Sequence, residues 1–186
     1  MLLNLPNTLT LFRIALIPIL VTLFYVPYEW TPMACAVIFA TASFTDLFDG
    51  YLARSRGQTT ELGAFLDPVA DKLMVGVALA LLIQMHSTAW LTIPALTIIC
   101  RELLVSALRE WMSTYGTQGK VDVAFIGKVK TALQMIAITG LFANPPQPVD
   151  WVLLLAYAFL YASFLMTIWS MFHYLRAAWP DLTANK

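Results

Sequence analysis

The segments DLFDGYLAR (residues 46–54) and GAFLDPVAD (residues 63–71) decide the fold of this chain. They place four carboxylates beside long apolar runs, namely those of Asp46, Asp49, Asp67 and Asp71. An aspartate at the centre of a membrane helix costs roughly 2.5 to 3.5 kcal/mol on insertion scales. Because four such charges would offset much of the insertion energy of two helices, we expect a ligand or counter-charges to compensate them.

Helical geometry gathers these acids on shared faces. At about 100° per residue, one face holds Asp46, Asp49, Gly50 and Ala53, and another holds Gly63, Asp67 and Asp71. Two helices can therefore present facing pairs of carboxylates, and small neighbours leave room for a ligand to approach. Oxygen donors with no His or Cys among them suit Mg²⁺ or Mn²⁺. Salt bridges to Arg54, Arg56 and Lys72 are the alternative interpretation.

The spacing of eight residues resembles the complete signature of the CDP-alcohol phosphotransferases: Asp46, Asp49, Gly50, Ala53, Arg54, Gly63, Asp67 and Asp71. The resemblance covers nearly the whole chain, notably in NLPNTLTLFR (residues 4–13) and IGKVKT (residues 126–131). It implies an all-α, polytopic membrane enzyme with six transmembrane helices, usually a homodimer. It also implies transfer of the phosphatidyl group from CDP-diacylglycerol to glycerol 3-phosphate, with release of CMP.

The resemblance implies a role for each signature residue. Two divalent cations, Mg²⁺ or Mn²⁺, would be held by the four aspartates and would clamp the pyrophosphate. Asp71 is the candidate catalytic residue, as the general base toward the acceptor hydroxyl. The CDP-diacylglycerol site would be formed by Asn7, Thr10, Asp46, Gly50, Ala53, Arg54 and Gly63.

The start of the chain supplies part of that expectation by itself. Asn7, Thr10 and Arg13 lie at spacings of three, on one side of the first apolar run, where they could hydrogen-bond a polar ligand head. An ordinary helix cap at Asn7 or Thr8 is the alternative.

The composition predicts an integral membrane protein. The 186-residue chain is 60% hydrophobic and 12% charged, against about 45–50% and about 25% in soluble domains. Six apolar runs of near-spanning length are predicted at residues 8–27, 32–54, 62–85, 88–112, 124–143 and 149–175. We expect a single membrane domain over residues 1–186 and no cleaved signal, because the first run continues to spanning length. A formal net charge of zero does not indicate nucleic-acid binding.

The placement of charge predicts the orientation. The linkers around Glu29, His86 and Pro146 contain no Lys or Arg. The other linkers and the C-terminal end hold Arg54, Arg56, Lys120, Arg176 and Lys186. By the positive-inside rule, both termini and the aspartates face the cytoplasm, in what the resemblance implies is a bacterial inner membrane.

A second group of charges is basic and flanks the turn between the fourth and fifth runs: Arg101, Arg109, Lys128 and Lys130. Converging guanidinium and ammonium groups would bind the phosphate of an acceptor through charge-assisted hydrogen bonds. Glu102 and Glu110 could instead neutralise the arginines locally.

Two other protein classes share some of these features. An ion transporter also uses intramembrane aspartates, but it needs no glycines on the carboxylate faces. An intramembrane prenyltransferase also pairs aspartates with Mg²⁺, but it attacks carbon and releases inorganic pyrophosphate. Within the resembled family, the acceptor could also be inositol phosphate, serine or phosphatidylglycerol.

Overall fold

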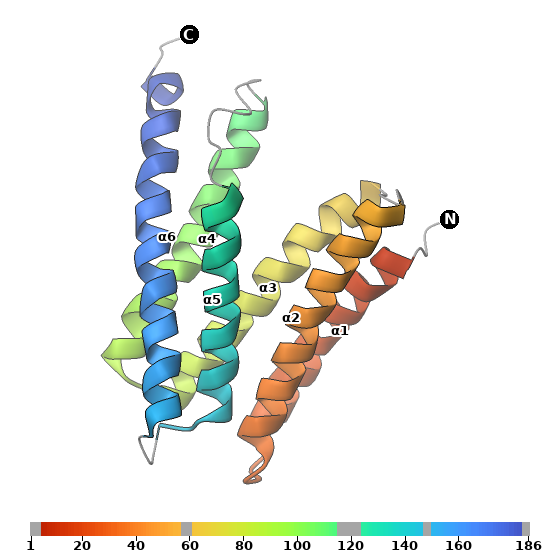
Figure 1. Ribbon diagram of the computed structural model, residues 1–186, viewed down its shortest axis with the longest axis vertical. Coiled ribbons are helices and arrows are strands. Elements are labelled where there is room, and N and C mark those ends of the chain that lie inside the picture. The colour runs from red at the N-terminus through yellow and green to blue at the C-terminus, as the bar shows by residue number, and fades with distance from the viewer. Residues whose placement is uncertain (1–4, 57–60, 115–123, 147–149, 184–186) are drawn as a thin grey trace.

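The computed structural model describes residues 5–56, 61–114, 124–146 and 150–183. Within these ranges the chain forms six α-helices and no strand: α1 Leu5–Phe24, α2 Thr31–Arg56, α3 Glu61–His86, α4 Ala89–Thr114, α5 Ala124–Ala143 and α6 Trp151–Thr183 (Figure 1). Some helical side chains are outside the description, at positions 5–6, 47–56, 61–62, 64, 109, 113–114, 124–126, 177–178 and 180–183. The predicted all-α class is confirmed. Each helix overlaps its predicted run, and the largest difference is that α6 continues past residue 175 to Thr183.

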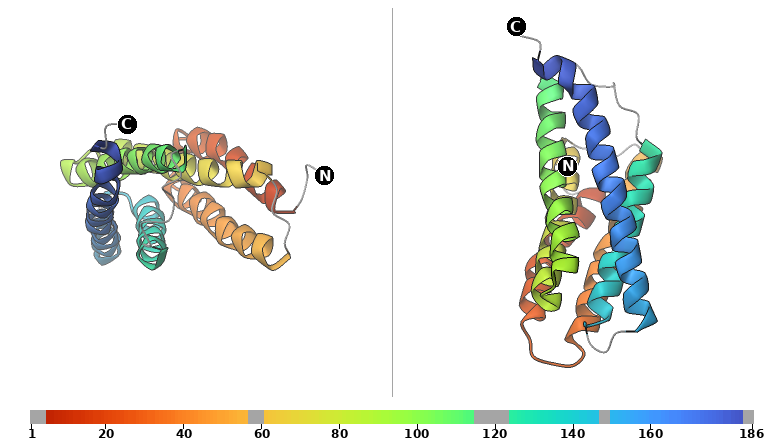
Figure 2. Two further views of the ribbon diagram at one scale, coloured as in Figure 1. Left: turned by 90° about the horizontal axis from the view of Figure 1, so that it is seen from above. Right: turned by 90° about the vertical axis from the view of Figure 1, so that its left-hand side faces the viewer.

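The helices pack in two layers of three. Seen from above, α1, α3 and α4 form one row, and α2, α5 and α6 form the other (Figure 2). Helix α5 packs between α2 and α6, while α3 packs between α1 and α4. The beginning of α1, the end of α2, the beginning of α3 and the end of α6 all lie toward one end of the molecule (Figure 1). We call it the N-terminal end.

Buried residues divide the molecule into an apolar half and a polar half. Large buried apolar side chains lie in the half remote from the N-terminal end, among them Leu20, Phe39, Leu82, Ile98, Phe142 and Leu160. The rings of Phe39 on α2 and Phe142 on α5 join two neighbouring helices of the second layer, with centroids 6.3 Å apart. Most of the described buried polar residues lie in the other half, namely Asn7, Thr10, Arg13, Arg101, Lys130, Gln134, Ser163, Thr167 and Ser170, whereas Thr31 and His86 are buried at the opposite end. Because buried polar groups need partners, the polar half is where a binding site is expected.

Among the residues that the structure describes, three helices are long and apolar enough to cross a membrane, over Asn7–Phe24, Ala89–Met112 and Trp151–Arg176. Large apolar side chains are exposed on the surfaces of these helices, such as those of Ile93, Leu154 and Leu165. Exposed apolar surface of this extent is typical of contact with lipid. The structure therefore supports a helical membrane protein.

Candidate active site

Three of the four predicted metal ligands surround one arginine where α1, α2 and α3 meet. Arg13 Nη1 donates a hydrogen bond to Asp46 Oδ1 at 2.8 Å and another to Asp71 Oδ1. Its Nη2 lies 3.8 Å from Asp67 Oδ1, which also accepts a hydrogen bond from Thr10 Oγ1. We call these three carboxylates with Arg13 and Thr10 the acidic cluster.

Helical spacing explains why these side chains meet. Thr10 and Arg13 are three residues apart on α1, and Asp67 and Asp71 are four residues apart on α3, so each pair shares one face. The Arg13 side chain is only 2% exposed, whereas those of Asp46, Asp67 and Asp71 are 24%, 39% and 38% exposed. The guanidinium is therefore buried beneath carboxylates that still reach solvent.

The remaining signature residues are placed by the backbone alone. Asp49, Gly50, Ala53 and Arg54 lie in α2 after Asp46, and their side chains are outside the described residues. Gly63 is buried in α3, one turn before Asp67.

The donor set of the acidic cluster fits a divalent cation. Three carboxylates against one guanidinium leave a net charge of minus two, and the accessible donors are hard oxygens. Within the described part of the chain, no three acidic, His or Cys side chains form a complete metal site. Arg13 separates the carboxylates there, and the side chain of Asp49 is not among those described. The fit therefore rests on the chemistry of the donors and on the uncompensated charge.

Two findings differ from the interpretations left open by the sequence. The alternative set of salt bridges included Lys72, but Lys72 Nζ donates to Ser106 Oγ of α4, while the side chains of Arg54 and Arg56 lie outside the described residues. Among the described side chains, Asp46, Asp67 and Asp71 pair with Arg13, for which the sequence pattern predicts only a general polar role. Helix α1 begins at Leu5, so Asn7 lies inside its first turn and is buried. A role as the helix N-cap therefore does not explain the position of Asn7.

The basic residues are only partly brought together. Arg101 on α4 and Lys130 on α5 both contact Glu102: Arg101 Nη1 lies 3.2 Å from Glu102 Oε1, and Lys130 Nζ donates to the same oxygen. We call Arg101, Glu102 and Lys130 the basic cluster. Lys128 is exposed and, two residues from Lys130, lies on a different face of α5. Arg109 is in α4, with its side chain outside the described residues.

Helix α6 supports the basic cluster with residues that sequence reasoning missed. Arg101 Nη2 donates to Ser170 Oγ at 2.8 Å, and the Arg101 guanidinium carbon is 5.9 Å from the ring centroid of Tyr174. One turn and two turns earlier lie buried Thr167 and Ser163, and the Ser163 hydroxyl is 3.5 Å from Gln134 Oε1 of α5. The signal that could have found them is the recurrence of hydroxyl residues every three or four positions in an apolar run.

The hydrogen bond from Lys72 to Ser106 links the two clusters. Lys72 follows Asp71 on α3, and Ser106 lies one turn after Glu102 on α4. At about 1.5 Å of rise per residue, Ser106 is about 6 Å along α4 from Glu102. The acidic and basic clusters are therefore neighbours across the boundary between α3 and α4.

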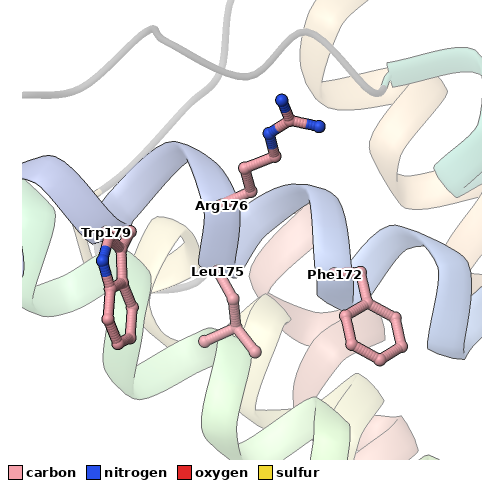
Figure 3. Close-up of a pocket in the computed structure, with 4 residues that line it drawn as sticks. All are labelled: Phe172, Leu175, Arg176 and Trp179. Carbon is pink, nitrogen blue, oxygen red and sulfur yellow. The ribbon is translucent and has the colours of Figure 1, made fainter.

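A shallow pocket of about 350 Å³ lies along the end of α6, away from these clusters. Phe172, Leu175 and Trp179 project to one side of the helix, and Arg176 projects to the other (Figure 3). Aromatic rings near a cation at a helix end are typical of a membrane interface.

Comparisons with known proteins show the family of the chain. The chain matches the family model described as CDP-alcohol phosphatidyltransferase over residues 3–169. It is 55% identical over 183 residues to the CDP-diacylglycerol–glycerol-3-phosphate 3-phosphatidyltransferase of Pseudomonas fluorescens, covering 98% of this chain and 93% of the relative. Proteins of the same name from Yersinia pestis and Pectobacterium atrosepticum are each 52% identical, over 180 and 179 residues, and the matches cover 97% and 96% of this chain and 97% of each relative. The family predicted from the signature residues is confirmed, and the chain belongs to the CDP-alcohol phosphatidyltransferases.

Proposed function

We propose that the chain is a phosphatidylglycerophosphate synthase, which transfers the phosphatidyl group of CDP-diacylglycerol to glycerol 3-phosphate and releases CMP. The observation that carries this proposal is the identity of 52–55%, over nearly the full length, to relatives whose names state that reaction. The two neighbouring clusters support it, because the donor brings a pyrophosphate and the acceptor brings a phosphate of its own.

The donor would bind at the acidic cluster. Asp46, Asp49, Asp67 and Asp71 would hold two divalent cations, Mg²⁺ or Mn²⁺. Cations bound there would neutralise charge on the pyrophosphate and make CMP a better leaving group. The CDP moiety would lie against Asn7, Thr10, Asp46, Gly50, Ala53, Arg54 and Gly63, where the residues without bulky side chains leave space. Thr10 orients Asp67 through its hydrogen bond.

Asp71 would be the general base. The acceptor oxygen forms a bond to the phosphorus that carries diacylglycerol, the bond from that phosphorus to CMP breaks, and Asp71 takes the hydroxyl proton. In the structure, Asp71 Oδ1 accepts a hydrogen bond from Arg13, which stabilises the charged carboxylate. Its effectiveness as a base therefore comes from position more than from basicity.

The phosphate of glycerol 3-phosphate would bind to Arg101, Arg109, Lys128 and Lys130. Of these, Arg101 and Lys130 have side chains only 8% exposed. Buried cations make the stronger contribution, since water screens them less. The Lys72–Ser106 hydrogen bond would keep this phosphate site beside Asp71.

The same proposal includes the setting of the enzyme. All six helices would span a bacterial inner membrane, with the polar half, the active site and both termini on the cytoplasmic side. The three apolar spans and the burial of polar groups toward one end support this arrangement. A homodimer in contact with membrane lipid is proposed from the family resemblance.

The test is an assay of the purified protein with CDP-diacylglycerol and a panel of acceptors: glycerol 3-phosphate, glycerol, inositol phosphate and serine. The expected result is CMP release that depends on glycerol 3-phosphate and on Mg²⁺ or Mn²⁺. Faster CMP release with another acceptor would change the assigned acceptor. Release of inorganic pyrophosphate from a prenyl donor, or cation flux without turnover, would overturn the reaction class.

A further inference from the structure

Glu102 lies between the two buried cations that the acceptor's phosphate would need. Its Oε1 accepts hydrogen bonds from both Arg101 Nη1 and Lys130 Nζ. Its side chain is 26% exposed, against 8% for each cation. Glu102 is therefore the most accessible member of the cluster, and its carboxylate is the one that an incoming anion can displace.

Arg101 is held in place by other contacts as well. Ser170 accepts a hydrogen bond from its Nη2, and the ring of Tyr174 faces its guanidinium. Its Nε is buried and has no hydrogen-bond acceptor in the part of the chain that the structure describes. Because Ser170 and Tyr174 contact Arg101 independently of Glu102, the guanidinium has contacts that remain when the carboxylate leaves.

The net charge of the basic cluster indicates which kind of anion can displace Glu102. Two cations and one carboxylate leave a net charge of plus one in the basic cluster. A monoanion that displaces the carboxylate exchanges one negative charge for another and gains little. A phosphomonoester dianion adds a second negative charge and three acceptor oxygens, enough to contact both cations at once.

We propose that Glu102 is a specificity-determining residue, which holds Arg101 and Lys130 until a phosphomonoester dianion displaces its carboxylate. The inference rests on the proposed function, because glycerol 3-phosphate is such a dianion. Phospholipid headgroups in the surrounding membrane carry phosphodiester monoanions, and a bare pair of buried cations would bind them too. Glu102 excludes these headgroups because an anion can displace its carboxylate only if that anion binds the two cations more tightly than the carboxylate does.

The experiment compares two soluble probes as competitors of glycerol 3-phosphate at pH 8: inorganic phosphate, a dianion, and dimethyl phosphate, a phosphodiester monoanion. The purified full-length protein, in nanodiscs of neutral lipid, is assayed as wild type, Glu102→Gln, Glu102→Asp and Glu29→Gln. The last variant is the matched control, because Glu29 is exposed in the turn between α1 and α2.

In wild type and Glu29→Gln, dimethyl phosphate should inhibit at least about tenfold more weakly than inorganic phosphate. In Glu102→Gln, dimethyl phosphate should bind about tenfold tighter, so that the preference for the dianion largely disappears. This change is expected if the state in which residue 102 does not occupy the two cations rises from about a tenth of the molecules to most of them. The KM for CDP-diacylglycerol should not change. Glu102→Asp keeps the charge and should keep the preference. Nanodiscs containing phosphatidylglycerol should inhibit Glu102→Gln and not wild type, which separates a lipid headgroup from a free phosphate.

Thermal unfolding provides a readout that does not need activity. Inorganic phosphate should stabilise both proteins, and dimethyl phosphate should stabilise only Glu102→Gln. An unchanged preference in Glu102→Gln, or a preference lost equally in Glu29→Gln, would overturn the role of Glu102. If Glu102→Gln does not fold, loss of the preference in Glu102→Asp would overturn it as well. A protein with this anion preference and no transferase activity would overturn the proposed function and leave the role of Glu102 standing.

Discussion

The two buried ionic clusters are built with opposite charges and opposite depths. In the acidic cluster, one buried cation, Arg13, lies beneath three carboxylates that reach solvent. In the basic cluster, one accessible carboxylate, Glu102, covers two buried cations. Arg13, the one cation of the acidic cluster, is thus its most buried member, whereas Glu102, the one acid of the basic cluster, is its most exposed member. Cations can be added over Arg13 while it stays in place, whereas an anion reaches Arg101 and Lys130 only by exchange with Glu102.

The largest effect is expected at the carboxylate with the proposed catalytic role. Asp71→Asn should reduce turnover by roughly 10² to 10⁴-fold, because the amide cannot take the acceptor's proton. Binding of CDP-diacylglycerol should persist in part, since the other acids remain. CMP release and donor binding by the purified protein measure the two separately. If Asp71→Asn kept more than about a tenth of the activity, another residue would have to accept the proton.

The second-largest effect is expected on stability, when the buried Arg13 is replaced. In chelator, Arg13→Gln should destabilise the protein by about 3 kcal/mol, because it removes a buried counter-charge shared by three neighbouring carboxylates. Added Mg²⁺ or Mn²⁺ should restore more stability to this variant than to wild type, since the cations then meet a more negative site. Thermal unfolding with and without the metal measures both.

Arg176→Gln is the matched control for Arg13, because Arg176 is exposed on α6. It should neither destabilise the protein comparably nor change the response to metal. Equal rescue of wild type and Arg13→Gln by metal would mean that Arg13 does not act as the counter-charge of the acids.

Lys130, in the basic cluster, and Lys128, just outside it, test whether burial decides how much a cation contributes to phosphate binding. Lys130→Met should raise the KM for glycerol 3-phosphate by roughly 10- to 100-fold, since a hydrogen bond to a charged group contributes about 1.5–3 kcal/mol. Lys128→Met, at an exposed position, should raise it by about threefold or less. The KM for CDP-diacylglycerol is the internal control and should stay constant. Equal effects of the two substitutions would mean that burial does not distinguish these cations.

The comparison also separates what the sequence could predict from what it could not. The six helices follow from apolar runs bounded by breakers, which are local features. Asp67 and Asp71 could be placed on one face because helical spacing is local too. The pairing of Arg13 with Asp46 and Asp71 joins positions 33 and 58 residues apart, and no local pattern specifies it.

The basic cluster gives the same lesson at shorter range. Sequence reasoning gathered Arg101 and Lys130 but grouped Lys128 with them, although the rotation of α5 turns Lys128 to another face. Glu102 was foreseen only as a neutralising alternative. Its contact with Lys130, across two helices, depends on how α4 and α5 pack.

A smaller effect than at Asp71, Arg13 or Lys130 is expected at the hydrogen bond that joins the two clusters. Ser106→Ala removes the acceptor of Lys72 while leaving every proposed ligand of substrate or metal in place. A single hydrogen bond contributes about 1 kcal/mol, so we expect kcat to fall about fivefold. The KM values of both substrates should change little, because each cluster keeps its own contacts and only their relative position is loosened. Ser106→Thr, which keeps the hydroxyl, should retain most of the activity.

Thr97 provides the matched control on the same helix. Among the described residues, its hydroxyl donates to the carbonyl oxygen of Ile93 within α4, so Thr97→Ala removes a hydroxyl without touching α3. Steady-state kinetics of Ser106→Ala and Thr97→Ala, measured together, isolate the contact between helices from the loss of a polar group. A fall in kcat limited to Ser106→Ala would show that the Lys72–Ser106 bond aligns the acidic cluster with the basic one. Equal kinetics in the two variants would mean that apolar packing alone aligns them, since the buried core in the opposite half then suffices to fix α3 against α4.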